Sequence, residues 1–130
     1  MRAYWDSSAL IAALHDPELR SRIRRGENGT RPHSLTEVFS TLTKGVSFRY
    51  PPTDAAKMAA DLAADLDFVE LSADDTVSAL KKASSLGVRG ARIHDLMHAM
   101  AAIKYQADEL LTLDDSGFAS LNLSLQITAP

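Results

Sequence analysis

Short apolar runs with strand character alternate with longer segments of helical periodicity along the whole chain. Strands are expected at residues 3–5, 30–33, 68–71, 110–113 and 123–128. Helices are expected at residues 8–15, 18–25, 34–45, 51–66, 72–87 and 93–105. Strands that alternate with helices pair in parallel, because each helix carries the chain back across a face of the sheet. The pattern therefore predicts an α/β fold, a three-layer α/β/α sandwich around a mainly parallel central sheet of four to five strands.

Three local patterns predict boundaries of these elements. Residues 26–29, Gly-Glu-Asn-Gly, have the composition of a loop. Ser34 followed by Glu37 is a capping box, in which the Ser34 hydroxyl accepts from the Glu37 N–H and the Glu37 carboxylate accepts from the Ser34 N–H. Ser72, with Asp75 three residues later, predicts the start of another helix. We therefore expect helices to begin at Ser34 and Ser72, with Glu37 in a first helical turn.

The composition is that of an ordinary globular domain. The chain has 130 residues, of which 45% are hydrophobic and 24% charged, and this length suits one domain over residues 1–130. It has no cysteine, so disulfides, thiolate metal ligands and a cysteine nucleophile are excluded. No apolar stretch approaches the roughly 20 residues of a membrane span. The opening MRAYWDSS reads as a strand and an acid rather than a signal peptide, and we expect a cytoplasmic protein.

Arginines are concentrated in one window, although the net charge of the chain is −3. The window contains Arg20, Arg22, Arg24, Arg25 and Arg31. A solvated helix end and loop would explain these charges, and so would a surface that meets RNA or an acidic protein segment. The window alone leaves both interpretations open, while the negative net charge argues against a protein held to nucleic acid by a bulk positive field.

Four acidic side chains come from four separate segments. Asp6 and Asp114 follow predicted strands, while Glu37 and Asp95 lie in the first turns of predicted helices. In a parallel sheet the carboxyl ends of the strands and the starts of the helices that follow them share one edge. We therefore expect the four carboxylates to meet at that edge. Taken singly, an acid in a first helical turn also stabilises its helix, and Asp114 has a rival in the adjacent Asp115.

Carboxylates that crowd together in this way need a cation between them. Two like charges about 4 Å apart repel by roughly 4 kcal/mol at an effective dielectric constant near 20. Oxygen ligands favour Mg²⁺, with Mn²⁺ as a substitute, and such an ion can activate water for attack on a phosphodiester. Ser7, Ser8 and Thr112 lie beside the acids and are candidates to orient carboxylates or bound water. His98, three residues after Asp95, is expected to be a partly buried helix histidine rather than a metal ligand.

The whole chain resembles the PIN-domain proteins, and in particular the VapC-type toxins of bacterial type II toxin–antitoxin pairs. The resemblance lies in four motifs in family order, at residues 4–10 (YWDSSAL), 34–38 (SLTEV), 90–102 and 111–118. It implies a PIN-like fold and endoribonuclease activity that depends on Mg²⁺ or Mn²⁺. It also implies an RNA substrate, a cognate antitoxin and a homodimer. The metal-binding and catalytic acids that it implies are Asp6, Glu37, Asp95 and Asp114.

One position departs from the pattern of this family. Gly117 precedes Phe118 where many relatives carry an acid, so the fourth carboxylate is that of Asp114, of Asp115 or of both. We prefer Asp114, because Thr112 then stands two residues before it, as the family pattern requires.

Two other functions compete with that of a nuclease. A haloacid-dehalogenase-like phosphatase needs a second acid two residues after its nucleophilic aspartate, and Ser8 stands there after Asp6. A catalytically silent PIN-like module that binds RNA or a protein partner is the alternative that remains open.

Overall fold

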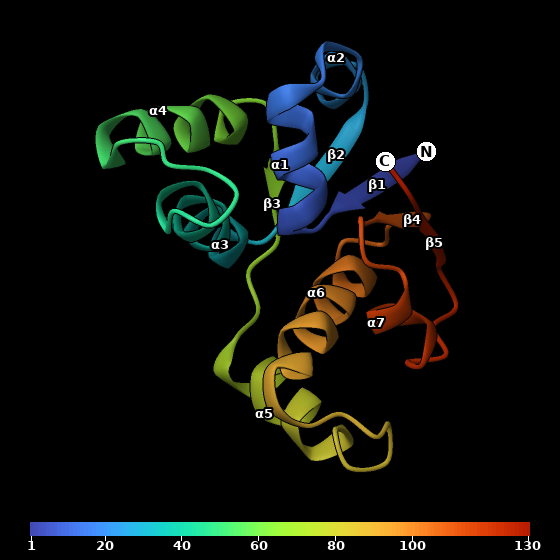
Figure 1. Ribbon diagram of the computed structural model, residues 1–130. Coiled ribbons are helices and arrows are strands. Elements are labelled where there is room, and N and C mark those ends of the chain that lie inside the picture. The colour runs from blue at the N-terminus through green and yellow to red at the C-terminus, as the bar shows by residue number, and fades with distance from the viewer.

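The computed structural model describes residues 1–130 and has a five-stranded sheet at its centre (Figure 1). The strands are β1 (Arg2–Trp5), β2 (Glu27–Thr30), β3 (Asp67–Phe68), β4 (Glu109–Leu111) and β5 (Gln126–Thr128). They lie in the order β3-β2-β1-β4-β5, and every neighbouring pair is parallel. In the central strand, Tyr4 stands opposite Gly29 of β2 and Leu110 of β4. The predicted α/β fold with a parallel sheet is confirmed.

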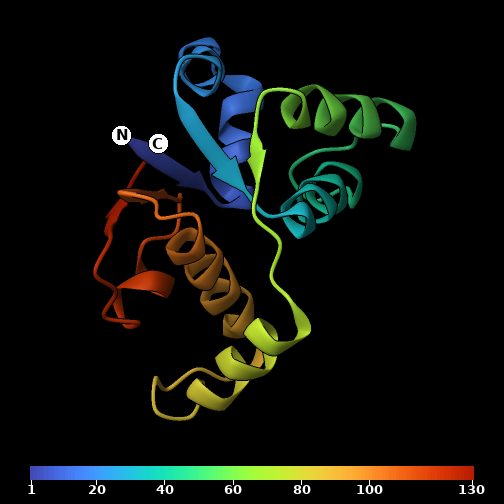
Figure 2. The same ribbon diagram turned by 180° about the vertical axis from the view of Figure 1, so that it is seen from behind.

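Helices cover both faces of this sheet. They are α1 (Ser7–His15), α2 (Pro17–Arg24), α3 (Pro32–Thr43), α4 (Pro52–Ala63), α5 (Ala73–Lys82), α6 (Ile93–Lys104) and α7 (Ser116–Ala119), with a 3-10 turn at Gly90–Arg92. Figures 1 and 2 show α1 to α4 on one side and α5 to α7 on the other. Successive strand residues face opposite sides, so Trp5 joins the core under α1 to α4 and Tyr4 the core under α6 and α7. None of the helices has the length and apolar character that crossing a bilayer requires.

Strand β2 occupies the segment for which the composition predicts a loop, so that prediction is wrong. The Asn28 side chain is buried: its Oδ1 accepts from the Trp5 indole N–H at 2.8 Å, and its Nδ2 donates to two backbone carbonyls of α2 at 3.2 Å. Gly29 lies under the ring of Tyr105, where a Cβ atom would come within 2.7 Å of a ring carbon. An amide and a glycine, which are turn residues by propensity, are therefore required here by tertiary neighbours.

Helix α3 begins at Pro32 rather than at Ser34, so the predicted capping box is wrong. Proline suits the first helical position, because its missing N–H has no partner there in any case. Ser34 is buried instead, with its hydroxyl 2.7 Å from that of Thr30. The earlier start places Glu37 in the second helical turn, where its side chain does not cap the N-terminus of the helix.

Other boundaries differ from the predictions by a few residues. Ser72 caps α5 in a capping box with Asp75, as predicted, but the helix ends at Lys82 instead of Gly87. The late strand β4 ends at Leu111, which leaves Asp114 in the loop that follows. The capping pattern at Ser72 thus located a helix start correctly, and the pattern at Ser34 did not. The Ser72 hydroxyl is at the surface, whereas that of Ser34 is buried.

Replacing Asn28 with alanine is expected to lower the free energy of unfolding by about 2–4 kcal/mol. The reason is that the buried Trp5 indole N–H and the Ile23 carbonyl would lose their bonds to Asn28, while the Arg22 carbonyl would keep its bond from the Arg25 N–H. Urea denaturation followed by the fluorescence of Trp5, the only tryptophan, measures this loss. Thr53→Ala, at an exposed site of α4, serves as the control and should change stability by less than about 0.5 kcal/mol. Equal stabilities of the two variants would contradict the assigned role of Asn28.

Candidate active site

Asp6 and Asp114 follow adjacent strands at the carboxyl edge of the sheet. Asp6 comes directly after β1, and its backbone N–H donates to the Leu111 carbonyl of β4 at 3.1 Å. Asp114 stands three residues after Leu111, so it belongs to the loop between β4 and α7 and does not end the strand. The parallel pairing of β1 with β4 therefore brings both acids to the same edge.

The carboxylate of Asp6 is buried and caps helix α1. Its Oδ1 accepts from the backbone N–H of Ala9 at 2.9 Å and from the Ser8 hydroxyl at 2.7 Å. No group of the protein donates to Oδ2, so one oxygen of Asp6 is available to another partner.

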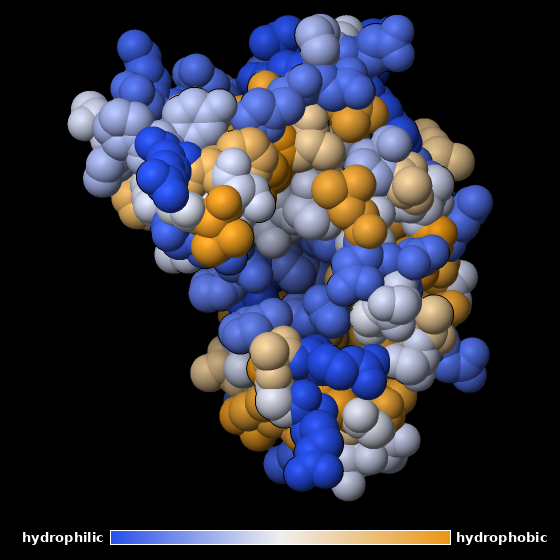
Figure 3. Space-filling view, viewed as in Figure 1, coloured by the Kyte–Doolittle hydropathy of each residue, from blue (hydrophilic) through white to orange (hydrophobic).

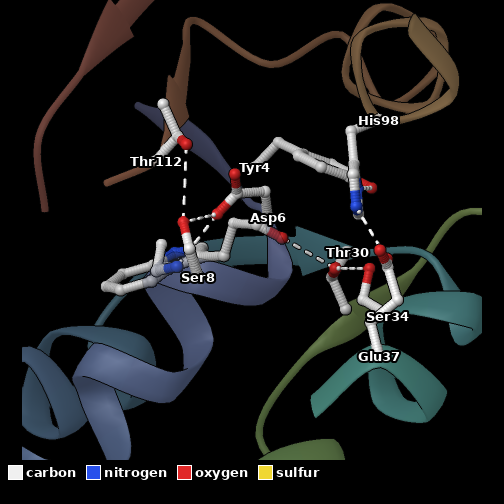
Figure 4. A network of polar contacts seen from close by, with 10 residues as sticks. Tyr4, Asp6, Ser8, Thr30, Ser34, Glu37, His98 and Thr112 are labelled. Carbon is white, nitrogen blue, oxygen red and sulfur yellow. Dashed lines mark hydrogen bonds and ion pairs between the residues drawn. The ribbon is translucent and has the colours of Figure 1, made fainter. Parts of the chain in front are cut away.

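Hydroxyl groups connect the Asp6 cap with the loop that carries Asp114 (Figure 4). The hydroxyls of Ser8 and Thr112 lie 3.4 Å apart, and Thr112 Oγ1 accepts from the backbone N–H of Asp114 at 3.0 Å. Ser8 and Thr112 thus lie where groups that orient Asp6 and the Asp114 loop would have to be. Ser7 does not contact Asp6 through its side chain and lines a neighbouring groove instead.

Asp95, near the start of α6, lies beside Asp114 across the backbone of Gly117. A Cβ atom at Gly117 would stand 2.5 Å from Oδ2 of Asp95 and 3.6 Å from Oδ2 of Asp114. A side chain at position 117 would therefore force the Asp95 carboxylate to move, whereas the Asp114 carboxylate would keep an ordinary contact. Both Asp114 and Asp115 are exposed, but Asp114 accepts from the Ser116 hydroxyl at 2.7 Å, whereas Asp115 makes no side-chain hydrogen bond.

The environment of Asp95 disfavours its negative charge. Partial burial, followed by the charges of Asp114 and Asp6, raises the pKa of Asp95, and the opposing influence of His98 and Arg92 does not cancel this effect. No group of the protein donates a hydrogen bond to this carboxylate. A half-buried carboxylate next to two others, without a partner of its own, suits a bound cation.

Glu37 reaches the site from α3 and is surrounded by histidines. Its Oε1 accepts from Nε2 of His98 at 2.9 Å, and Nδ1 of His98 lies 2.8 Å from the Tyr4 hydroxyl (Figure 4). Burial by itself would raise the pKa of Glu37. The bond from His98 and the positive charge of His98, His33 and His94 when protonated outweigh burial and hold the pKa below its ordinary value. Glu37 is therefore ionised at neutral pH.

The four acids divide into two neighbourhoods along the edge of the sheet. The charges of Asp6 and Asp114 both act on Asp95, whereas Glu37 interacts with His98, which also acts on Asp95. No three of the aspartate, glutamate and histidine side chains are close enough to hold one metal ion together. The acids thus share one edge of the sheet, but their carboxylates are spread along it.

His98 is a buried histidine of α6 that contacts one of the candidate acids, Glu37. The expected helix histidine is only 3% exposed, yet both ring nitrogens have side-chain partners. The spacing of three residues from Asp95 was the available signal, because it places both side chains on one helical face. Nothing in the sequence indicates that the partner is Glu37, which is 61 positions away.

Three of the five arginines between residues 20 and 31 are paired within the protein. The pairs are Arg20 and Arg24 with Asp65, and Arg22 with Glu109. Arg25 and Arg31 make no ion pair. The larger part of this window therefore stabilises the fold, and only two of its charges are free to meet a partner.

A groove with polar walls runs beside Glu37. It is lined by Ser7, His33, Thr36, Glu37, Ser40 and Thr41. Figure 3 shows hydrophilic residues in the indentation between the part of the molecule that contains α3 and the part that contains α5 and α6. Such walls offer little to an apolar ligand. Their hydroxyl, imidazole and carboxylate groups can form hydrogen bonds with a polar ligand.

Solved structures with this fold include toxin–antitoxin proteins. One chain of VapBC2 from Rickettsia felis, bound to a DNA fragment from their promoter, is 15% identical with a TM-score of 0.72, over 100% of this chain and 99% of that chain. PAE2754 from Pyrobaculum aerophilum is 18% identical with a TM-score of 0.70, over 98% of this chain and 90% of that chain. VapBC-5 from Mycobacterium tuberculosis, a member of the VapBC family of toxin–antitoxin systems, is 20% identical with a TM-score of 0.58, over 99% and 98%.

No curated protein matches the chain in sequence. The sequence does match the family model of the PIN domain, over residues 3–122. This match includes β1 except for its first residue, β2 to β4, and all four candidate acids. The chain therefore belongs to the PIN domain family.

Proposed function

We propose that this chain is a metal-dependent endoribonuclease that acts as the toxin of a type II toxin–antitoxin pair. The observation that carries the proposal is the group of three aspartates at the carboxyl edge, in which Asp95 is half-buried, has a raised pKa and lacks a hydrogen-bond partner. Membership of the PIN domain family and the likeness in fold to VapBC proteins support it. The polar groove beside Glu37 favours RNA over an apolar substrate.

The ion would be Mg²⁺, with Mn²⁺ able to take its place. Asp6, Asp95 and Asp114 would hold it after their side chains move closer together, since no three of them lie close enough to share an ion in this structure, and Glu37 would complete the site from the side of the groove. Their oxygen atoms are the ligands that a hard cation prefers, and both Oδ2 of Asp6 and the carboxylate of Asp95 have no competing donor. When bound, the ion would activate a water and stabilise the charge that develops on the phosphate.

Other residues would keep these acids in their places. The Ser8 hydroxyl donates a hydrogen bond to Oδ1 of Asp6, so that Oδ2 of this carboxylate is left for the ion. Thr112 holds the backbone of Asp114 and thereby the loop after β4. These contacts reduce the freedom that the acids would lose on binding. They also favour Asp114 over Asp115 as the fourth acid, because Asp115 has no such support.

The proposal includes the partners of a toxin of this kind. A cognate antitoxin would neutralise the nuclease, and the chain would act in the cytoplasm as a homodimer. The antitoxin is supported by the VapBC proteins that share the fold. Arg25 and Arg31, which lack internal partners, are candidates to meet RNA or an acidic antitoxin segment.

EDTA is expected to abolish the cleavage of RNA by the purified chain, and Mg²⁺ or Mn²⁺ to restore it. Asp95→Asn removes one negative charge and keeps the side-chain shape. It is expected to lower the cleavage rate at least about 100-fold, because even the outer partners of metal ligands are worth roughly 10- to 100-fold. Gel assays on a panel of structured RNAs measure the rate, and growth arrest on expression in a bacterium is the cellular counterpart. Asp74→Asn, at an exposed position of α5, is the matched control.

The same experiment separates the nuclease from the silent binding module. If Asp95→Asn arrests growth as fully as the unaltered chain does, the metal mechanism is wrong and toxicity comes from binding alone. If the unaltered chain neither cleaves RNA nor arrests growth, the toxin assignment fails as well.

Gly117→Ala is expected to lower the cleavage rate by about 10-fold or more while the fold is kept. The added methyl group would meet the carboxylate of Asp95, a side-chain end that can rotate away at the expense of its position in the site. Gly26→Ala is the control, since its nearest contact would be an ordinary 3.6 Å. Cleavage rates and melting temperatures of both variants test this. Full activity of Gly117→Ala would show that the spacing of Asp95 and Asp114 does not matter.

A further inference from the structure

We propose that Tyr4 and His98 form a positioning pair that holds Glu37 in place relative to the aspartates and thereby sets the metal affinity of the site. This inference rests on the proposed function, because it treats Glu37 as a member of the metal site. Neither residue would touch the ion or the substrate. Both would act through Glu37.

The pair is one continuous chain of hydrogen bonds between three elements. The Tyr4 hydroxyl of β1 lies 2.8 Å from Nδ1 of His98 on α6, and Nε2 of the same ring donates to Oε1 of Glu37 on α3 at 2.9 Å. Figure 4 shows the imidazole between the phenol and the carboxylate. The contacts thus join α3 to the central strand through a single ring.

Each member of the pair stands close in sequence to an acid of the site. Tyr4 precedes Asp6 by two residues, and His98 follows Asp95 by three on the same helix. The chain of hydrogen bonds therefore joins the helices that carry Asp95 and Glu37 to the strand that ends directly before Asp6. A shift of Glu37 against either aspartate would have to break one of these bonds.

The direction of both hydrogen bonds follows from the chemistry of the groups. An ionised Glu37 only accepts, so Nε2 of His98 carries the proton. In the neutral ring Nδ1 is then the acceptor, and the Tyr4 hydroxyl must donate to it. Burial raises the pKa of Tyr4, so the phenol keeps this proton. Tyr4 thereby selects the one tautomer of His98 that can donate to Glu37.

The pair is shielded from water. Tyr4 is fully buried and His98 nearly so, and their rings pack edge to face with centroids 5.8 Å apart. A hydrogen bond between such groups does not exchange readily with solvent, and leaving either partner unpaired would be costly. The geometry at Glu37 is therefore held more firmly than a surface contact could hold it.

Helix α3 has a second attachment to the same strand. The Thr30 hydroxyl donates to the Trp5 carbonyl at 2.7 Å and lies 2.7 Å from the Ser34 hydroxyl. Ser34 and Glu37 are three residues apart and thus lie on one face of α3. With its first turn anchored through Ser34, the remaining freedom of the Glu37 carboxylate is in its side-chain torsions, and His98 removes it.

The test compares the Mn²⁺ affinities of the unaltered chain and of variants of the pair, measured by the electron paramagnetic resonance signal of free Mn²⁺. His98→Ala is expected to weaken binding by about 10- to 100-fold, the usual effect of removing a partner of a metal ligand. Tyr4→Phe, which keeps the ring, is expected to weaken it by roughly 3- to 10-fold. His98→Gln, whose amide can still donate to Glu37, should recover part of the loss. RNA cleavage rates should follow the same order.

Tyr105→Phe is the matched control. It also removes a hydroxyl that donates to a carboxylate, that of Asp67 at 2.6 Å, but this bond involves none of the acids of the site. Its Mn²⁺ affinity should equal that of the unaltered chain. The ¹⁵N shifts of the His98 ring provide a second readout: the ring should be the Nε2-protonated tautomer, and Tyr4→Phe should change this population.

The outcomes distinguish this inference from the function on which it rests. An unaltered chain that binds no Mn²⁺ would overturn both. Binding by the unaltered chain together with full affinity in folded His98→Ala would overturn only the positioning pair. If His98→Ala does not fold, Tyr4→Phe decides, and unchanged affinity with an unchanged His98 tautomer would overturn the inference.

Discussion

At the centre of the sheet β1 pairs in parallel with β4, with Tyr4 opposite Leu110 and Trp5 opposite Leu111. Both strands therefore end at one edge, and Asp6 and the loop of Asp114 come out beside one another. Helix α6 crosses near this edge with its N-terminal turn and brings Asp95 to the same place. The arrangement of the site depends on this pairing, because a shift in its register would separate Asp6 from Asp114.

Placing several carboxylates together creates an electrostatic demand that the protein meets differently at each position. Asp6 receives a backbone N–H and a hydroxyl, and Glu37 receives an imidazole N–H. Asp95 receives nothing, and its pKa is raised. Asp95, the acid without a hydrogen-bond donor, is also the acid on which the charges of Asp6 and Asp114 both act. A cation bound to Asp95 would therefore relieve this repulsion.

Two sets of contacts support the two neighbourhoods. Ser8 and Thr112 serve Asp6 and Asp114, and could be suspected from the sequence because each lies within two residues of the acid it serves. Tyr4 and His98 serve Glu37. The sequence gives no reason to suspect this role, because the three residues come from a strand and two helices that are far apart in the chain. Buried positions of this kind are usually apolar, and an isolated tyrosine or histidine in an apolar segment resembles ordinary core packing.

The sequence by itself determined the alternation of strands and helices, hence the parallel sheet, and the four segments that carry acids. Those features depend on periodicity and on neighbours within one turn or strand. Only the tertiary structure decided that residues 27–30 form a strand, that α3 starts at Pro32, and that His98 meets Glu37. In each case a contact between residues far apart in the sequence is involved: Asn28 with Trp5, Thr30 with Trp5, and His98 with Tyr4. Burial beside a distant residue outweighs local propensity there, because an unpaired buried polar group costs more than an unfavourable local conformation.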